Sequence, residues 1–194
     1  MGRRDTGRDV PRHSLHHSPV IRGLSLQLLL WGLSCTVGCT PADQEPDVAL
    51  VDHLSWMTTP TTSDPLAQHR PGEVSCPETS WAEEDGTLEV DTTTCNYLSL
   101  DQPSAAAVAA GQRVRIVLWH DRLDAEQPGQ AHAAITLSDQ TIWERLIPIP
   151  SDAAVYDEQV TITMGANQSV PVGLHLHNHG DNTWNLLEIT RLGQ

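Results

Sequence analysis

The chain has 194 residues, enough for one ordinary domain with short appendages and too few for two domains with separate cores. Its 39% hydrophobic and 19% charged residues are typical of a soluble globular protein, and they exclude a disordered chain or a multi-span membrane protein. All 11 basic residues are arginine, so chemistry that requires a lysine amine is excluded. Against 25 acidic residues they leave a formal charge of -14, which disfavours nucleic acid and anionic lipid headgroups as partners.

An uncharged, leucine-rich run from Leu24 to Cys39 follows Arg22 near the N-terminus. This run is shorter than the roughly 20 apolar residues of a permanent transmembrane helix. It ends with a small residue before a cysteine, at Cys39 after Gly38 or at Cys35. The ending resembles the signal peptide of bacterial lipoproteins. The resemblance implies export, lipidation of Cys39 with Cys35 as the alternative, and anchoring in the cell envelope, at the outer membrane by preference and facing the periplasm or the exterior. An ordinary secretory signal with incidental cysteines is the other interpretation.

The sequence therefore divides into a leader and signal peptide (1–38), an acidic, proline-containing tether with one docked element (39–72), and a folded domain (73–194). Removal of the leader takes away five arginines and two aspartates, which leaves 23 acidic and six basic residues and a net charge of -17. Cys76 and Cys95 then remain, separated by 18 residues and without a C-x-x-C spacing. In an oxidising compartment this pair is expected to form a disulfide, in preference to a metal site.

Short stretches of period-two alternation, separated by Gly, Pro, Asn or Asp, follow Cys76. They lie at residues 87–91, 96–100, 113–119, 131–137, 141–146, 160–164, 170–177 and 184–190. Such a pattern predicts an all-β fold, an antiparallel β-sandwich of jelly-roll type with at most one or two short helices. One alanine-rich helix is expected over 103–110, ending at Gly111.

Alternation along the strand at 170–177 places Val172, Leu174 and Leu176 inward and His175 and His177 outward. The same argument for the strand at 131–137 places His132 on an outward side. The pair His175 and His177 brings two imidazoles about 7 Å apart at the backbone, close enough to share a metal.

Two interpretations of the histidines remain open. A third ligand from His132 or His179 would complete a metal site with His175 and His177, because neutral imidazoles suit zinc or copper. Alternatively, these are surface side chains with ordinary hydrogen bonds, and no cofactor binds.

The segment 177–184 is predicted to be a hairpin whose Asn178, Asp181 and Trp184 combine planar polar groups with an indole. Sugar hydroxyls pair with amides and carboxylates, and an aromatic face covers the C–H surface of a sugar ring. The predicted ligand-binding residues are His175, His177, Asn178, Asp181 and Trp184. Turn formation alone explains the same Asn, Gly and Asp residues.

The short strands and this Asn/Asp/Trp hairpin resemble galactose-binding-like and carbohydrate-binding modules of jelly-roll type. The resemblance implies binding of a glycan. No nucleophile motif occurs, so no catalytic residue is predicted and an enzyme is disfavoured. Arg113 and Arg115, on one strand face, are expected to neutralise neighbouring acids.

The leading hypothesis is a non-catalytic cell-envelope lipoprotein whose β-sandwich binds a glycan or an envelope protein and no nucleic acid. The alternatives are a histidine-based zinc or copper protein, including a metal-dependent enzyme, and a structural envelope protein.

Overall fold

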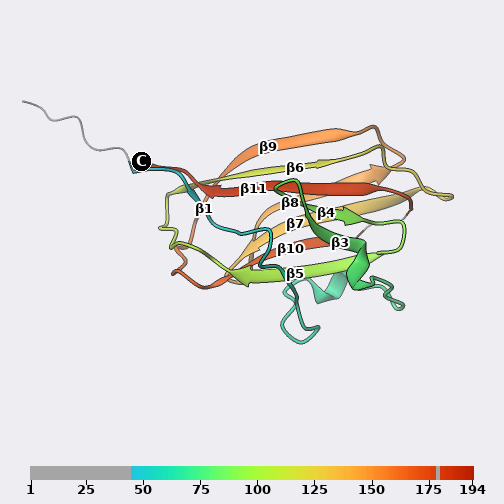
Figure 1. Cartoon of the computed structure of the whole chain (residues 1–194), viewed down its shortest axis with the longest axis horizontal. Helices are drawn as coiled ribbons and strands as arrows, with labels where there is room; N and C mark the ends of the chain where they lie inside the picture. The colour runs from blue at the N-terminus through green and yellow to red at the C-terminus, as the bar shows by residue number, and fades with distance from the viewer. Residues whose placement is uncertain (1–44, 178–179) are drawn as a thin grey trace, which may run out of the picture. The chain divides into compact units, whose positions relative to one another are not determined.

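The computed structural model describes residues 45–177 and 180–194, which form two packed antiparallel sheets (Figure 1). Sheet A has the order β3-β4-β11-β6-β9, with β1 also paired to β11, and sheet B has the order β2-β5-β10-β7-β8. The strands of sheet A are β1 (Val48–Ala49), β3 (Trp81–Glu84), β4 (Thr87–Asp91), β6 (Arg113–His120), β9 (Ala154–Thr161) and β11 (Thr183–Arg191). The strands of sheet B are β2 (Met57–Thr58), β5 (Tyr97–Pro103), β7 (Gly129–Leu137), β8 (Gln140–Ile149) and β10 (Pro171–His177). The predicted all-β fold, an antiparallel sandwich, is confirmed.

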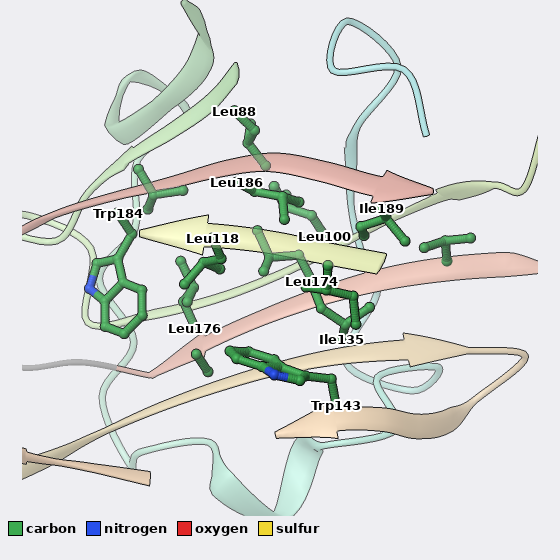
Figure 2. Packing of buried hydrophobic residues seen from close by; sticks show 14 of the residues in the cluster. Leu88, Leu100, Leu118, Ile135, Trp143, Leu174, Leu176, Trp184, Leu186 and Ile189 are labelled. Atoms are coloured by element: carbon green, nitrogen blue, oxygen red, sulfur yellow. The ribbon is translucent and has the colours of Figure 1, made fainter. Parts of the chain in front are cut away.

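The core lies between the sheets and consists of their inward side chains (Figure 2). Val172, Leu174 and Leu176 of β10 are buried there, as alternation predicts. Opposite them, sheet A contributes Leu118 and Leu186, which are also fully buried. Alternation thus leaves one outer face on each sheet for other roles.

The sequence predicts that the segment before residue 73 is a tether with one docked element. In the structure it contributes one strand to each sheet of the sandwich. Its strand β1 pairs with β11 in sheet A, and its strand β2 pairs with β5 in sheet B. Between these strands Leu50 and Trp56 are buried in the core. The chain therefore passes from one sheet to the other here and helps to close the sandwich.

The helical elements of the described residues are two short 3-10 turns, η1 (Ala67–His69) and η2 (Glu78–Ser80). The prediction of a helix over 103–110 is wrong. Backbone groups in that segment pair elsewhere, since Val108 forms a two-way bridge with Ala166. Alanine propensity is a weak preference that such tertiary pairing overrides.

The strand expected at 160–164 instead runs from Ala154 to Thr161. Its inward side includes Glu158, which accepts hydrogen bonds from the Trp143 indole and the Arg145 guanidinium of β8. Polar residues on the inward side hide the alternation by which a strand is recognised in sequence.

A disulfide joins Cys76 and Cys95, as predicted. It links Cys76, two residues before η2, to Cys95, two residues before β5, across a sequence separation of 19. Cys35 and Cys39, the predicted lipidation sites, lie outside the described residues. Across the described part of the chain, no helix combines the length and the apolar character needed to cross a membrane.

Candidate binding sites on the two outer faces

The segment 177–184 connects the two sheets and is not the predicted hairpin, because β10 pairs with β5 and β7 whereas β11 pairs with β4 and β6. Trp184 points into the core, where its ring lies 4.6 Å from that of His120 between centroids. The expectation that this indole faces a ligand is therefore wrong. Asp181 is exposed in the connection, and Asn178 and His179 lie outside the described residues.

His132, His175 and His177 share the outer face of sheet B, as their alternation indicates. His177 is in register with both Tyr97 and His132, and His175 is in register with Ala134. The predicted exposure of His132 and His175 to solvent is wrong, since both side chains are buried, His175 to 2% exposure. Alternation decides only the side of a sheet to which a side chain points.

Residues 64–70, here called the cover segment, lie over this histidine-bearing face. Within the segment Asp64 and Leu66 are buried. The hydroxyl of Tyr97 on β5 donates to the Asp64 carboxylate, with the carbonyl of Leu66 3.3 Å away. Burial and the Asp64 carboxylate raise the pKa of Tyr97, which keeps its hydroxyl protonated. The guanidinium of Arg70 lies 5.2 Å from the centre of the Tyr97 ring.

The cover segment brings His69 against the sheet, where it forms a cluster with His132, His175 and Glu144. We call these four residues the histidine cluster. The ring centroid of His69 lies 4.3 Å from that of His132 and 5.8 Å from that of His175, and the last two are 4.7 Å apart. The Nε2 atom of His132 lies 2.7 Å from Oε1 of Glu144. His69, His132 and Glu144 each place one potential ligand atom within 4.8 Å of the others.

Two members of the histidine cluster are missing from the sequence-based prediction. His69 follows a loop rich in Thr and Pro, and no local pattern relates it to strands about 60 and 100 residues further along the chain. Glu144 lies in an expected strand, but its proximity to His132 depends on the pairing of β7 with β8.

Burial keeps the buried histidines of the cluster neutral. It lowers the pKa of His175 to about 3, with smaller effects from His132, His69 and His177. Burial also lowers the pKa of His132, although the hydrogen bond to Glu144 acts in the opposite direction. At neutral pH the imidazole lone pairs are consequently not blocked by protonation.

The outer face of sheet A carries a different arrangement, which we call the Trp119 face. It is a row of side chains in register across five strands, namely Ala82, Glu89, Asn185, Trp119 and Val155. Val155 is 72% exposed, Trp119 and Glu89 are half-buried, and Asn185 is buried. Asn185 accepts a hydrogen bond from the Thr87 hydroxyl at 3.4 Å, whereas its Nδ2 has no hydrogen-bond partner within the described residues.

A hollow continues the Trp119 face at the β3–β4 edge. Its lining residues are Thr79, Ser80, Trp81, Ala82, Glu84, Glu89 and Asp91. Burial, followed by the nearby Glu84 and Asp91 carboxylates, raises the pKa of Glu89. This end of the row is therefore acidic and rich in hydrogen-bond acceptors.

Further along the outer face of sheet A, Arg115 makes an ion pair of two hydrogen bonds with Asp157, at 2.7 and 2.8 Å, and a third contact with Glu188 at 3.1 Å. The predicted neutralising role of this arginine is confirmed. Arg113 donates to the neutral side chain of Gln159 instead.

No protein-family model and no curated protein matches the chain. Among solved structures, a CBM4 carbohydrate-binding module is similar at a TM-score of 0.40 and 12% identity over 77% of this chain and 96% of that one. The module TmCBM61, solved in complex with β-1,4-galactotriose, has a TM-score of 0.38 and 8% identity over 75% and 99%. The agarase AgWH50C has a TM-score of 0.39 and 13% identity over 77% of this chain and 25% of its own. Likeness at this level is to the general arrangement of strands and carries no argument about function.

Proposed function

We propose that this domain is a non-catalytic binding domain that takes a neutral oligosaccharide on the Trp119 face. The observation that carries the proposal is the half-buried Trp119 indole on the outer face of sheet A, in one register row with the half-buried Glu89 carboxylate. An indole covers the C–H face of a sugar ring, while amide and carboxylate groups pair with its hydroxyls. An aromatic face and a hydrogen-bonding carboxylate, two of the groups that recognise sugars, thus lie in one row.

The charge around the row selects a neutral glycan. Glu84, Glu89 and Asp91 line the hollow at its end, and no positively charged residue is among the lining residues. An anionic sugar would meet repulsion there. Glu89 and Trp119 are separated by two strand spacings, about 10 Å, which suits an oligosaccharide better than a single sugar.

The proposal extends to the location of the protein. The chain is exported and attached to a bacterial envelope by a lipid on Cys39, or on Cys35 if processing occurs earlier. The small-residue-cysteine ending of the signal supports this location. The disulfide between Cys76 and Cys95 is in keeping with an oxidising compartment. An envelope protein, in place of a glycan, is the other class of partner.

Binding is tested by calorimetric titration of the full chain with neutral oligosaccharides of glucose, xylose and galactose, with a polyuronate as the anionic counterpart. Trp119→Ala is expected to weaken binding at least about 10-fold, as loss of a central aromatic contact does. Leu146→Ala is the matched control, because Leu146 is 55% exposed on the outer face of sheet B. Equal affinity of Trp119→Ala and the unmodified protein would overturn the assignment of this face. Release of new reducing ends during incubation would overturn the non-catalytic part.

The anchor is tested separately by labelling the producing bacterium with radioactive palmitate. Label is expected on the unmodified chain and on Cys35→Ser, and not on Cys39→Ser. Labelling of Cys39→Ser but not Cys35→Ser would assign the anchor to Cys35, and absence of label from the unmodified chain would overturn it.

A further inference from the structure

We propose that the histidine cluster binds one divalent transition-metal ion of the zinc or copper class, through His69, His132, Glu144 and His175. This inference is independent of glycan binding, because the cluster lies on sheet B and the Trp119 face lies on sheet A. The ion would join the cover segment, through His69, to three strands of the sheet, β7, β8 and β10.

The first support is the set of buried polar atoms without partners in the cluster. Neither ring nitrogen of His175 has a hydrogen-bond partner among the described residues. A buried polar group left in this state is destabilising, because it has lost its hydrogen bonds to water and gained none in the fold. Proteins rarely leave such atoms without a ligand or water that accounts for them. A bound metal ion would accept the lone pair of a His175 nitrogen, for which the described residues provide no hydrogen-bond donor.

The second support is convergence from elements far apart in the sequence. His132 and His175 lie on paired strands, Glu144 lies on the next strand, and His69 comes from η1 above them. Ala134 stands between His175 and Glu144 in the register, and its methyl side chain leaves room for the larger groups on either side. The four residues thus border one space between the sheet and the cover segment.

For three of the four ligands, His69, His132 and Glu144, the geometry needs only small movements to hold an ion. Metal–ligand bonds of 2.0–2.2 Å in a tetrahedron place the ligand atoms roughly 3.4 Å apart. The ligand atoms of His69, His132 and Glu144 lie within 4.8 Å of one another, and the His132–Glu144 hydrogen bond is 2.7 Å long. Binding would open this hydrogen bond by less than an ångström and draw His69 inward. Glu144, whose side chain is 47% exposed, and His69, on a short turn, are the members able to move.

The donor set decides the class of metal. Three imidazoles and one carboxylate suit zinc or copper, whereas calcium and magnesium prefer oxygen ligands alone. Four protein ligands fill a tetrahedral shell and leave no open position for a substrate. The proposed site is therefore structural, and its effect is to hold the cover segment on sheet B.

The test uses the full chain, purified without a tag, stripped with a chelator and titrated with zinc sulfate or copper sulfate in a calorimeter. Histidines of the leader contribute a background that is common to all variants. His69→Ala and Glu144→Gln are expected to remove one equivalent of bound metal or to weaken it at least about 10-fold, since even indirect partners of a metal site have that effect. His53→Ala is the matched control, because His53 bonds to the Leu187 carbonyl at the other sheet.

A second readout follows the cover segment itself. Hydrogen exchange of residues 64–70 is expected to slow when metal is added to the unmodified protein and to His53→Ala, and to stay unchanged in His69→Ala. Circular dichroism of each variant confirms that it is folded. Equal metal binding by the unmodified protein, His69→Ala and Glu144→Gln would overturn the proposal, as would the absence of any stoichiometric metal.

Discussion

Replacement of Tyr97 by phenylalanine removes the hydroxyl that joins the cover segment to sheet B. This hydroxyl donates to the buried Asp64 carboxylate, and a hydrogen bond to a charged group contributes about 1.5–3 kcal/mol. The ring remains, with its contacts to His175 at 5.1 Å and His177 at 5.9 Å between centroids. Asp64 also keeps the hydrogen bond from the Leu66 amide. We therefore expect Tyr97→Phe to lower the free energy of unfolding by about 2 kcal/mol and Tm by about 4–8 °C.

The assay is urea unfolding of the single variants Tyr97→Phe and Asp64→Ala and of the double variant. If the two groups interact directly, the cycle gives a coupling free energy of about 1–3 kcal/mol. Tyr156→Phe is the control. The Tyr156 hydroxyl has a longer contact, 3.3 Å, with His120, and both residues belong to sheet A, away from the cover segment. A coupling free energy near zero, or an equal effect of Tyr156→Phe, would refute the role of Tyr97 in holding the cover segment.

The same hydroxyl predicts a dependence on alkaline pH. Burial and Asp64 raise the pKa of Tyr97 above its ordinary value of 10, so the native state keeps the proton when the unfolded chain has begun to lose it. The contribution of this group to stability is complete below about pH 10 and declines as the pH rises further. Between pH 9 and 11 the free energy of unfolding should fall more steeply for the unmodified protein than for Tyr97→Phe. Parallel slopes would contradict this.

Three further predictions concern other parts of the fold. Burial lowers the pKa of His120. The contribution of this imidazole to stability is therefore complete above about pH 6.5, and the free energy of unfolding falls by at most about 2 kcal/mol between there and pH 5. In urea unfolding, His120→Gln should lack this fall. Replacing Cys76 and Cys95 by serine opens a loop with a sequence separation of 19, which should lower stability by about 3 kcal/mol in the same assay. A side chain at Gly173 would meet the Thr136 hydroxyl, so Gly173→Ala should lower the free energy of unfolding by about 1–3 kcal/mol, measured by thermal unfolding. Adding Thr136→Ala should restore part of the lost stability. No recovery in the double variant would contradict the clash.

Of the candidate sites, the sequence could predict which side chains share a face of one strand, because this follows from alternation along that strand. His132, His175 and His177 share an outer face because side-chain direction repeats every two residues, a property local to each strand. The burial of His132 and His175 could not be predicted in the same way. It depends on the cover segment, whose Pro- and Thr-rich approach indicates a loop but not where that loop packs.

Pairing between distant strands is the part that the sequence could not provide. The row that contains Trp119 exists because β11 lies between β4 and β6, and nothing within the local sequence of β6 indicates those neighbours. The segment 177–184 shows the converse problem. Its Asn, Gly and Asp residues suit any tight change of direction, so a connection between sheets has the same composition as a hairpin within one.

The separation of the two outer faces leads to a last prediction about how the two proposed sites relate. The cover segment contacts Tyr97, His132 and His175 of sheet B, whereas the Trp119 face belongs to sheet A, and the packed core of the sandwich, about 10 Å thick, lies between them. Removing metal should loosen residues 64–70 without moving the Trp119 row, because no described contact joins the two. Glycan affinity measured by calorimetry should therefore be equal with zinc and with chelator, and Trp119→Ala should bind metal normally. A glycan affinity that changes with metal would instead indicate that the sheets shift as one unit, and the assignment of two independent sites would fail.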